Sequence, residues 1–140
     1  NFHAAVTYGN APTVDILVGR LDGAATLSLQ VDTAGWALRT RGRGSTKSPH
    51  HYEWAVGKKS ATLYRSDLFF AFVDLKSGSD QKPDVFIVPS KVIFDSFNNP
   101  YFKSGKPRFW RWHPKVNDIE QFRNDWDILD SFLIEKTEKH

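Results

Sequence analysis

Two short segments near the start of the chain each place polar residues among apolar neighbours. Residues 14–20 and 25–33 each have the pattern of a β-strand, and the Asp22-Gly23 pair between them favours a hairpin turn. We therefore expect these two strands to lie antiparallel to one another. Residues 36–41 are predicted to continue this meander, and residues 42–49 to form a flexible basic loop.

Two later segments, residues 68–75 and 85–88, are almost continuously apolar. Such runs are typical of central strands that are covered on both faces. Residues 52–56 predict a further strand, and short helices are expected from Ser60 to about Arg65 and over residues 91–97. The pattern predicts a mixed α+β fold of the α/β type, in which a central mixed β-sheet of about four to six strands is flanked by helices.

The end of the chain predicts an amphipathic helix over residues 117–134 that packs on the rest of the domain. Its apolar residues recur at spacings of three and four, and Asp118 with Gln121 has the spacing of a capping box. We expect the whole chain, residues 1–140, to form a single domain. The predicted apolar stripe consists of Ile119, Phe122, Trp126, Leu129 and Leu133.

Polar side chains interrupt the first two predicted strands: Asp15 in one, and Gln30 and Asp32 in the other. Gln30 and Asp32 are two residues apart, so they point from the same face of a strand. A carboxylate among aliphatic neighbours needs a cation or hydrogen bonds to compensate its burial. We expect the three side chains to converge on a metal ion. The alternative is structural, with the Asp carboxylates accepting backbone N–H bonds at turns and Gln30 bonding within the core.

Five motifs follow one another along the chain: Val14-Asp15-Ile16-Leu17-Val18, Leu29-Gln30-Val31-Asp32-Thr33, Trp54-Ala55-Val56-Gly57-Lys58-Lys59, Leu68-Phe69-Phe70-Ala71-Phe72-Val73-Asp74-Leu75 and Pro83-Asp84-Val85-Phe86-Ile87-Val88-Pro89-Ser90. Their order resembles the PD-(D/E)XK nuclease superfamily, and most closely its small bacterial members of unknown role. The resemblance covers about residues 10–95, with a weaker echo at residues 124–129. It implies a restriction-endonuclease-like fold.

The resemblance also implies roles for individual residues. Asp15, the Gln30 side chain and the Val31 carbonyl would hold Mg²⁺ or Mn²⁺, with Asp32 as a further metal ligand. The family has a catalytic Lys at the position of Asp32, so we expect Lys58 or Lys59 to supply the missing positive charge. Members of the family also carry a Glu on a helix before the first strand. No acidic residue precedes Asp15 and the chain opens without Met, so we expect it to lack the N-terminal helix of the domain.

The formal net charge is only +3, but its distribution is uneven. Residues 39–59 and 103–115 are rich in Lys and Arg, whereas residues 118–138 are rich in Asp and Glu. A basic middle attracts phosphate backbones, so double-stranded DNA is the expected partner; the alternative is that these charges are ordinary solvated faces. The candidate DNA-binding residues are Arg39, Arg41, Arg43, Lys47, Arg108 and Arg111.

Aromatic residues alternate with Arg in Phe109-Trp110-Arg111-Trp112, which predicts a strand with both Trp side chains on one side. His50 and His51 are expected to point in opposite directions, and His113 has no partner at helical spacing, so no metal site is expected from the histidines. The chain has no Cys and no apolar run long enough to span a bilayer, and we expect a cytoplasmic protein. Its oligomeric state stays open, with a homodimer as one arrangement.

Two functions follow as expectations. The first is a metal-dependent endonuclease, a hydrolase that cleaves DNA phosphodiester bonds with Mg²⁺. The second is a degenerate relative that binds DNA or protein on the same scaffold without catalysis, because Asp32 repels the phosphate.

Overall fold

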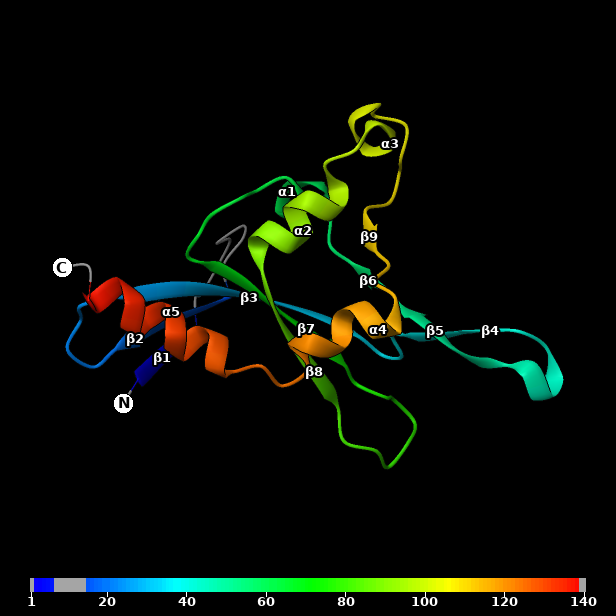
Figure 1. Ribbon diagram of the computed structural model, residues 1–140, viewed down its shortest axis with the longest axis horizontal. Helices are drawn as coiled ribbons and strands as arrows, with labels where there is room; N and C mark the ends of the chain where they lie inside the picture. The colour runs from blue at the N-terminus through cyan, green and yellow to red at the C-terminus, as the bar shows by residue number, and fades with distance from the viewer. Residues whose placement is uncertain (1, 7–14, 139–140) are drawn as a thin grey trace.

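A five-stranded mixed sheet of order β1-β2-β3-β7-β8 forms the centre of the computed structural model, which describes residues 2–6 and 15–138 (Figure 1). Strands β3 and β7 are parallel, whereas the other neighbouring pairs are antiparallel. The predicted mixed sheet of four to six strands is therefore confirmed, as is the hairpin of the second and third strands. The strands of this sheet are β1 (Phe2–Val6), β2 (Ile16–Arg20), β3 (Thr26–Ala34), β7 (Leu68–Asp74) and β8 (Asp84–Pro89).

Two small sheets and several short helices surround the central sheet. One small sheet pairs β4 (Leu38–Arg41) with β5 (Ser48–Tyr52), and the other pairs β6 (Trp54–Ala55) with β9 (Arg111–Trp112). The helices are α1 (Lys58–Ala61), α2 (Ser90–Phe97), α3 (Pro100–Lys103), α4 (Val116–Ile119) and α5 (Asp127–Glu138), with single 3-10 turns η1 (Gly44–Thr46) and η2 (Glu120–Phe122). No helix of the described residues is both long and apolar enough to cross a membrane.

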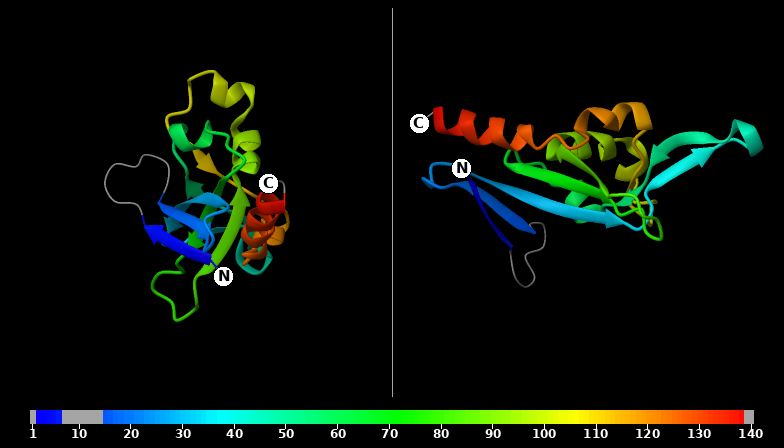
Figure 2. Two further views of the ribbon diagram at one scale, coloured as in Figure 1. Left: turned by 90° about the vertical axis from the view of Figure 1, so that its left-hand side faces the viewer. Right: turned by 90° about the horizontal axis from the view of Figure 1, so that it is seen from below.

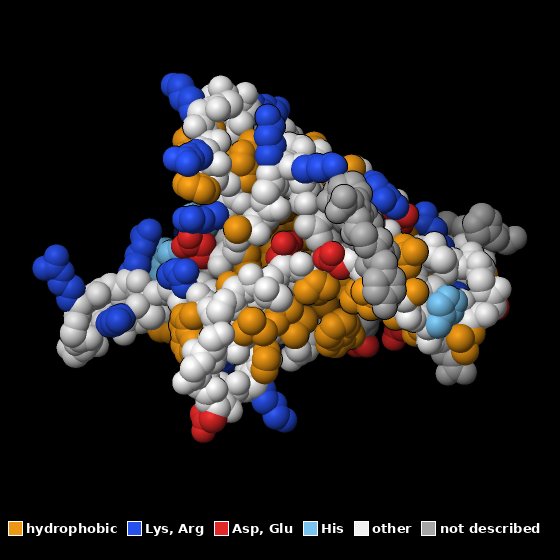
Figure 3. Space-filling model, turned by 180° about the vertical axis from the view of Figure 1, so that it is seen from behind, with side chains coloured by type: hydrophobic (Ala, Val, Ile, Leu, Met, Phe, Trp, Pro, Cys, Tyr) orange, Lys and Arg blue, Asp and Glu red, His pale blue; other side chains and the backbone are white. Residues whose placement is uncertain are grey.

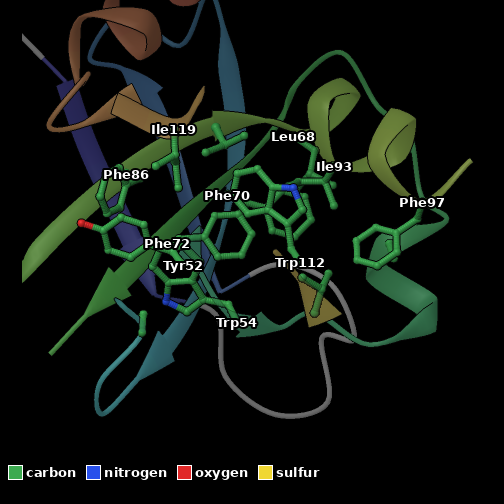
Figure 4. Packing of buried hydrophobic residues seen from close by; sticks show 14 residues of the cluster. Tyr52, Trp54, Leu68, Phe70, Phe72, Phe86, Ile93, Phe97, Trp112 and Ile119 are labelled. Atoms are coloured by element: carbon green, nitrogen blue, oxygen red, sulfur yellow. The ribbon is translucent and has the colours of Figure 1, made fainter. Parts of the chain in front are cut away.

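The sheet buries a different hydrophobic core on each face, because side chains of a strand alternate in direction. Phe70 and Phe72 of β7 pack in the first core with Trp54 and Trp112, as Figure 4 shows. Phe69 and Ala71 face the second core, which also contains Leu129 and Leu133 of α5. The apolar runs of β7 and β8 are thus covered on both sides, which confirms the prediction made for them.

The C-terminal residues differ most from the prediction, because no continuous helix spans residues 117–134. Helix α4 and η2 are separated from α5 by residues 123–126, where Asn124 has a φ of 49°. The Asn124 N–H donates to the Val85 carbonyl, so the chain runs along the edge strand β8 at this point. The predicted stripe is divided as a result: Ile119 lies in the first core, Leu129 in the second, and Trp126 is 49% exposed.

The predicted capping box is also absent, since α4 begins after Lys115 and the Gln121 Nε2 donates to the Asp118 carbonyl. Other elements also begin or end at residues different from those predicted. Strand β4 leaves the central sheet instead of continuing its meander, and residues 42–49 include η1 and the start of β5 rather than a plain loop. Val14, predicted to begin a strand, lies outside the described residues.

Candidate functional site

Asp15 stands one residue before β2, beside the middle of β3. Its Oδ2 accepts a 2.7 Å hydrogen bond from the Val31 N–H, and its own N–H donates to the Leu29 carbonyl. The antiparallel register of β2 and β3, extended by one residue, sets Asp15 opposite Gln30. Because Leu29 and Val31 belong to the second core, Gln30 and Asp32 face the first-core side of the sheet. We call Asp15, Gln30 and Asp32 the acidic cluster.

Burial perturbs the carboxyl group of Asp32. Desolvation, and then the negative charge of Asp15, raise the pKa of Asp32 from 3.8 to about 7, whereas the Gln30 side chain lowers it. The negative charge of Asp15, which the register of β2 and β3 sets beside this strand, adds to the effect of burial on Asp32. Near neutral pH Asp32 therefore exchanges a proton readily, and a cation would compete with that proton.

Two oxygen atoms of the acidic cluster are buried without a hydrogen-bond partner among the described residues: Gln30 Oε1 and Asp32 Oδ2. An unsatisfied buried oxygen is costly, by about 1–3 kcal/mol. Carboxylate and amide oxygens are the ligands that Mg²⁺ and Ca²⁺ prefer. The donor set of the cluster, with two carboxylates and an amide, therefore fits a hard divalent cation. In residues 2–6 and 15–138 there is no group of three or more His, Asp or Glu side chains with metal-ligand geometry.

Helix α1 meets the acidic cluster through Ser60, whose Oγ accepts a 2.9 Å hydrogen bond from Gln30 Nε2. The sequence did not indicate this contact, because Ser60 is 30 residues away and was assigned to a helix cap. Lys58 and Lys59 stand on the same helix, not on a strand, and both are exposed. Neither makes an ion pair with a described carboxylate. Lys58 lines a cleft with Arg108 and Trp110, and the direction of Lys59 toward the cluster stays a prediction.

Among the predicted DNA-binding residues, Arg39 and Arg111 are held by one carboxylate. Arg39 Nε lies 3.6 Å from Glu53 Oε2, and Arg111 Nη1 lies 3.4 Å from Glu53 Oε1. Arg108 and Arg111 also stack over the Phe109 ring, with guanidinium carbons 5.4 and 4.9 Å from its centre. Arg41, Arg43 and Lys47 have no ion pair with a described residue, so they are the more available cations. On the face drawn in Figure 3, Lys and Arg side chains line the upper edge, above acidic side chains near the middle.

The Glu53 carboxylate also lies near two histidines that were predicted to have no partners. His51 Nε2 and His113 Nε2 lie 3.9 and 3.8 Å from its carboxylate, and the Nδ1 atoms of His50 and His51 are 3.0 Å apart. Burial and the neighbouring His113 and His50 lower the pKa of His51. The expectation that the two adjacent histidines diverge is therefore wrong. His50 and His51 belong to β5, Glu53 follows β5, and His113 follows β9. No local spacing in the sequence reveals the contact between these two regions.

The alternation of residues 109–112 is confirmed, since Trp112 is buried and Trp110 half-buried while Phe109 is 61% exposed. Phe109 lines an open cleft of about 940 Å³ between α2, β9 and α4. None of the acidic cluster contributes to this cleft, so this hollow is separate from the candidate site.

Comparisons with family models, with curated proteins and with solved structures find no match to this chain.

Proposed function

We propose that this chain is a metal-dependent nuclease-like domain that acts on DNA phosphodiester bonds. The resemblance in motif order is the starting point, and a mixed sheet with helices on its faces supports the restriction-endonuclease-like fold that it implies. One observation carries the proposal: Gln30 Oε1 and Asp32 Oδ2 are buried without partners among the described residues, beside the carboxylate of Asp15. A divalent cation would satisfy both of these oxygens and would be attracted by the Asp15 carboxylate.

In this proposal Asp15, the Gln30 side chain, the Val31 carbonyl and Asp32 are the ligands of Mg²⁺ or Mn²⁺. When bound, the metal would lower the pKa of a water molecule and neutralise charge on the scissile phosphate. Ser60 orients the Gln30 amide, leaving its oxygen for the cation. The family places a lysine at the position of Asp32. Lys59, which is adjacent to Ser60 on α1, is the candidate to supply that positive charge in this chain.

A second function is favoured by Asp32 itself. A second carboxylate at this position repels a phosphate group unless a cation or a proton neutralises it. Without such neutralisation, the scaffold would bind DNA or protein through its basic residues and would not cleave. The two proposals share the scaffold and differ in whether phosphodiester bonds are hydrolysed.

A plasmid-nicking assay with Mg²⁺ or Mn²⁺ tests the enzymatic proposal. We expect slow nicking by the wild-type protein, abolished by EDTA and by Asp15→Ala, and unchanged by Asp130→Asn on the exposed face of α5. Asp32→Lys removes one proposed ligand but places a positive charge beside the phosphate, so it separates the two functions. Loss of nicking supports Asp32 as a metal ligand, whereas faster nicking, by about 10²–10³ for one well-placed group, identifies Asp32 as the residue that disables the site. If folded wild-type and Asp32→Lys proteins both leave the plasmid intact, the enzymatic proposal fails and the non-catalytic function remains.

A further inference from the structure

A two-stranded ribbon extends from the body of the molecule. It consists of β4, η1 and β5, residues 38–52, which we call the arm, and Figures 1 and 2 show it projecting away from the central sheet. At its base Tyr52 is buried and stacks on Trp54, with ring centres 5.4 Å apart. Every residue from 39 to 49 is exposed. The outer part of the arm therefore adds nothing to either hydrophobic core.

The tip of the arm nevertheless has a defined shape. Gly42 has a φ of 101°, and a Cβ at this position would lie 2.4 Å from the backbone oxygen of Thr46. Thr46 Oγ1 accepts from the Arg43 N–H at 3.1 Å and donates to the Arg43 carbonyl at 2.7 Å. Only glycine fits at position 42 without moving the backbone. A fixed tip on an otherwise unsupported ribbon is a feature that folding of the body does not require.

Charge is distributed unevenly along the arm. Arg39, near the base, is paired with Glu53. Farther out, Arg41, Arg43 and Lys47 have no ion pair with any described residue, and no acidic residue occurs between Asp32 and Glu53 in the sequence. The outer arm is thus a positively charged surface without internal compensation, which fits a polyanion.

The dimensions of the arm indicate which polyanion. Paired strands lie about 4.8 Å apart, and a two-stranded ribbon with side chains enters the major groove of B-DNA, which is about 12 Å wide, but not the minor groove of about 6 Å. A single strand offers no groove. We propose that the arm inserts its tip into the major groove of duplex DNA, where Arg41, Arg43 and Lys47 contact phosphates and base edges. This inference rests on the proposed function for the identity of the ligand and adds the element that selects duplex over single strand.

Fluorescence anisotropy with a labelled duplex and the matching single strand, over a range of salt concentrations, tests the charge of the arm. The test variant is Arg41→Ala/Arg43→Ala/Lys47→Ala. The control is Lys82→Ala/Lys103→Ala/Lys136→Ala, which removes the same net charge from exposed sites elsewhere that make no ion pair with a described residue. We expect the arm variant, but not the control, to lower the slope of log affinity against log salt by about 2–3 and to weaken duplex binding at least about tenfold. Both variants should keep the wild-type thermal unfolding, because all six side chains are exposed.

Methylation of guanine N7 by dimethyl sulfate tests the groove, since N7 lies in the major groove. We expect wild-type protein and the control variant to protect specific N7 atoms. Gly42→Ala should lose this protection while keeping every charge, whereas Ser45→Ala, at an exposed residue of the same tip without a positive φ, should retain it.

Three results would overturn the inference: unchanged salt dependence in the arm variant, tighter binding of the single strand, or N7 protection that survives Gly42→Ala. A protein that binds no DNA at all contradicts the DNA partner of the proposed function as well. A protein that binds duplex through other residues contradicts only the role of the arm.

Discussion

Replacing Asp32 by Asn removes an ionisable group whose environment opposes its charge. Burial and the nearby Asp15 raise the pKa of Asp32 to about 7 in the folded protein, against 3.8 for an unperturbed group. Between these two pH values the folded state binds more protons than the unfolded state, so the free energy of unfolding of the wild type falls as pH rises. At 1.36 kcal/mol per pKa unit the full effect has an upper limit of about 4 kcal/mol.

Asn has nearly the same shape as Asp but carries no charge, so it removes this penalty. Because Asp32 is only half-buried, we expect Asp32→Asn to be more stable than the wild type by about 2–3 kcal/mol at pH 8.5 without divalent cations. The advantage should shrink as pH falls from about 7 towards 4 and be lost below about pH 3, where Asp32 is protonated in both states.

Urea denaturation followed by tryptophan fluorescence, in EDTA at several pH values from 5 to 8.5, measures this difference. Asp130→Asn, which removes an exposed carboxylate from α5, is the matched control. A difference between wild type and Asp32→Asn that stays constant across this pH range would refute the reasoning, as would a less stable variant at pH 8.5.

Three further outcomes are expected. Arg123→Ala should lower the free energy of unfolding by about 1–3 kcal/mol in urea titrations, because its guanidinium bonds Asp84 at 2.7 Å and Glu120 at 2.8 Å; Arg123→Lys should recover part of the loss. Leu129→Ala should cost about 2–4 kcal/mol and Trp126→Ala less than about 1 kcal/mol, since only Leu129 is buried; equal losses would contradict the broken C-terminal helix. Mg²⁺ at pH 8.5 should raise the melting temperature of the wild type, and EDTA should reverse the increase in a thermal-shift assay.

Much of the central sheet was predictable because its cause is local. Two strand-like runs joined by an Asp-Gly turn are sufficient to predict the hairpin of β2 and β3, and continuous apolar runs identify β7 and β8 as central strands. The C-terminal helix was predicted wrongly because its apolar spacing is helical throughout. What interrupts it is a tertiary contact, the bond from the Asn124 N–H to the Val85 carbonyl, which divides the stripe between two cores.

The candidate site shows the same division between local and long-range information. The same-face placement of Gln30 and Asp32 follows from their spacing, and the hairpin brings Asp15 beside them. In contrast, the contact of Gln30 with Ser60 and the convergence on Glu53 depend on how separate elements pack. No sequence spacing encodes those contacts, so the paired state of Arg39 and Arg111 could not be predicted.

Binding of Mn²⁺ to the acidic cluster is the most direct test of the central claim. Free Mn²⁺ gives an electron paramagnetic resonance signal that is lost on binding, so a titration at pH 8.5 counts sites on the protein. We predict one site per chain in the wild type, lost in Asp15→Asn, greatly weakened in Asp32→Asn and retained in Asp130→Asn. Equal Mn²⁺ binding by the wild type and Asp15→Asn, or no binding by the wild type, would contradict the assignment of Asp15, Gln30 and Asp32 as a metal site.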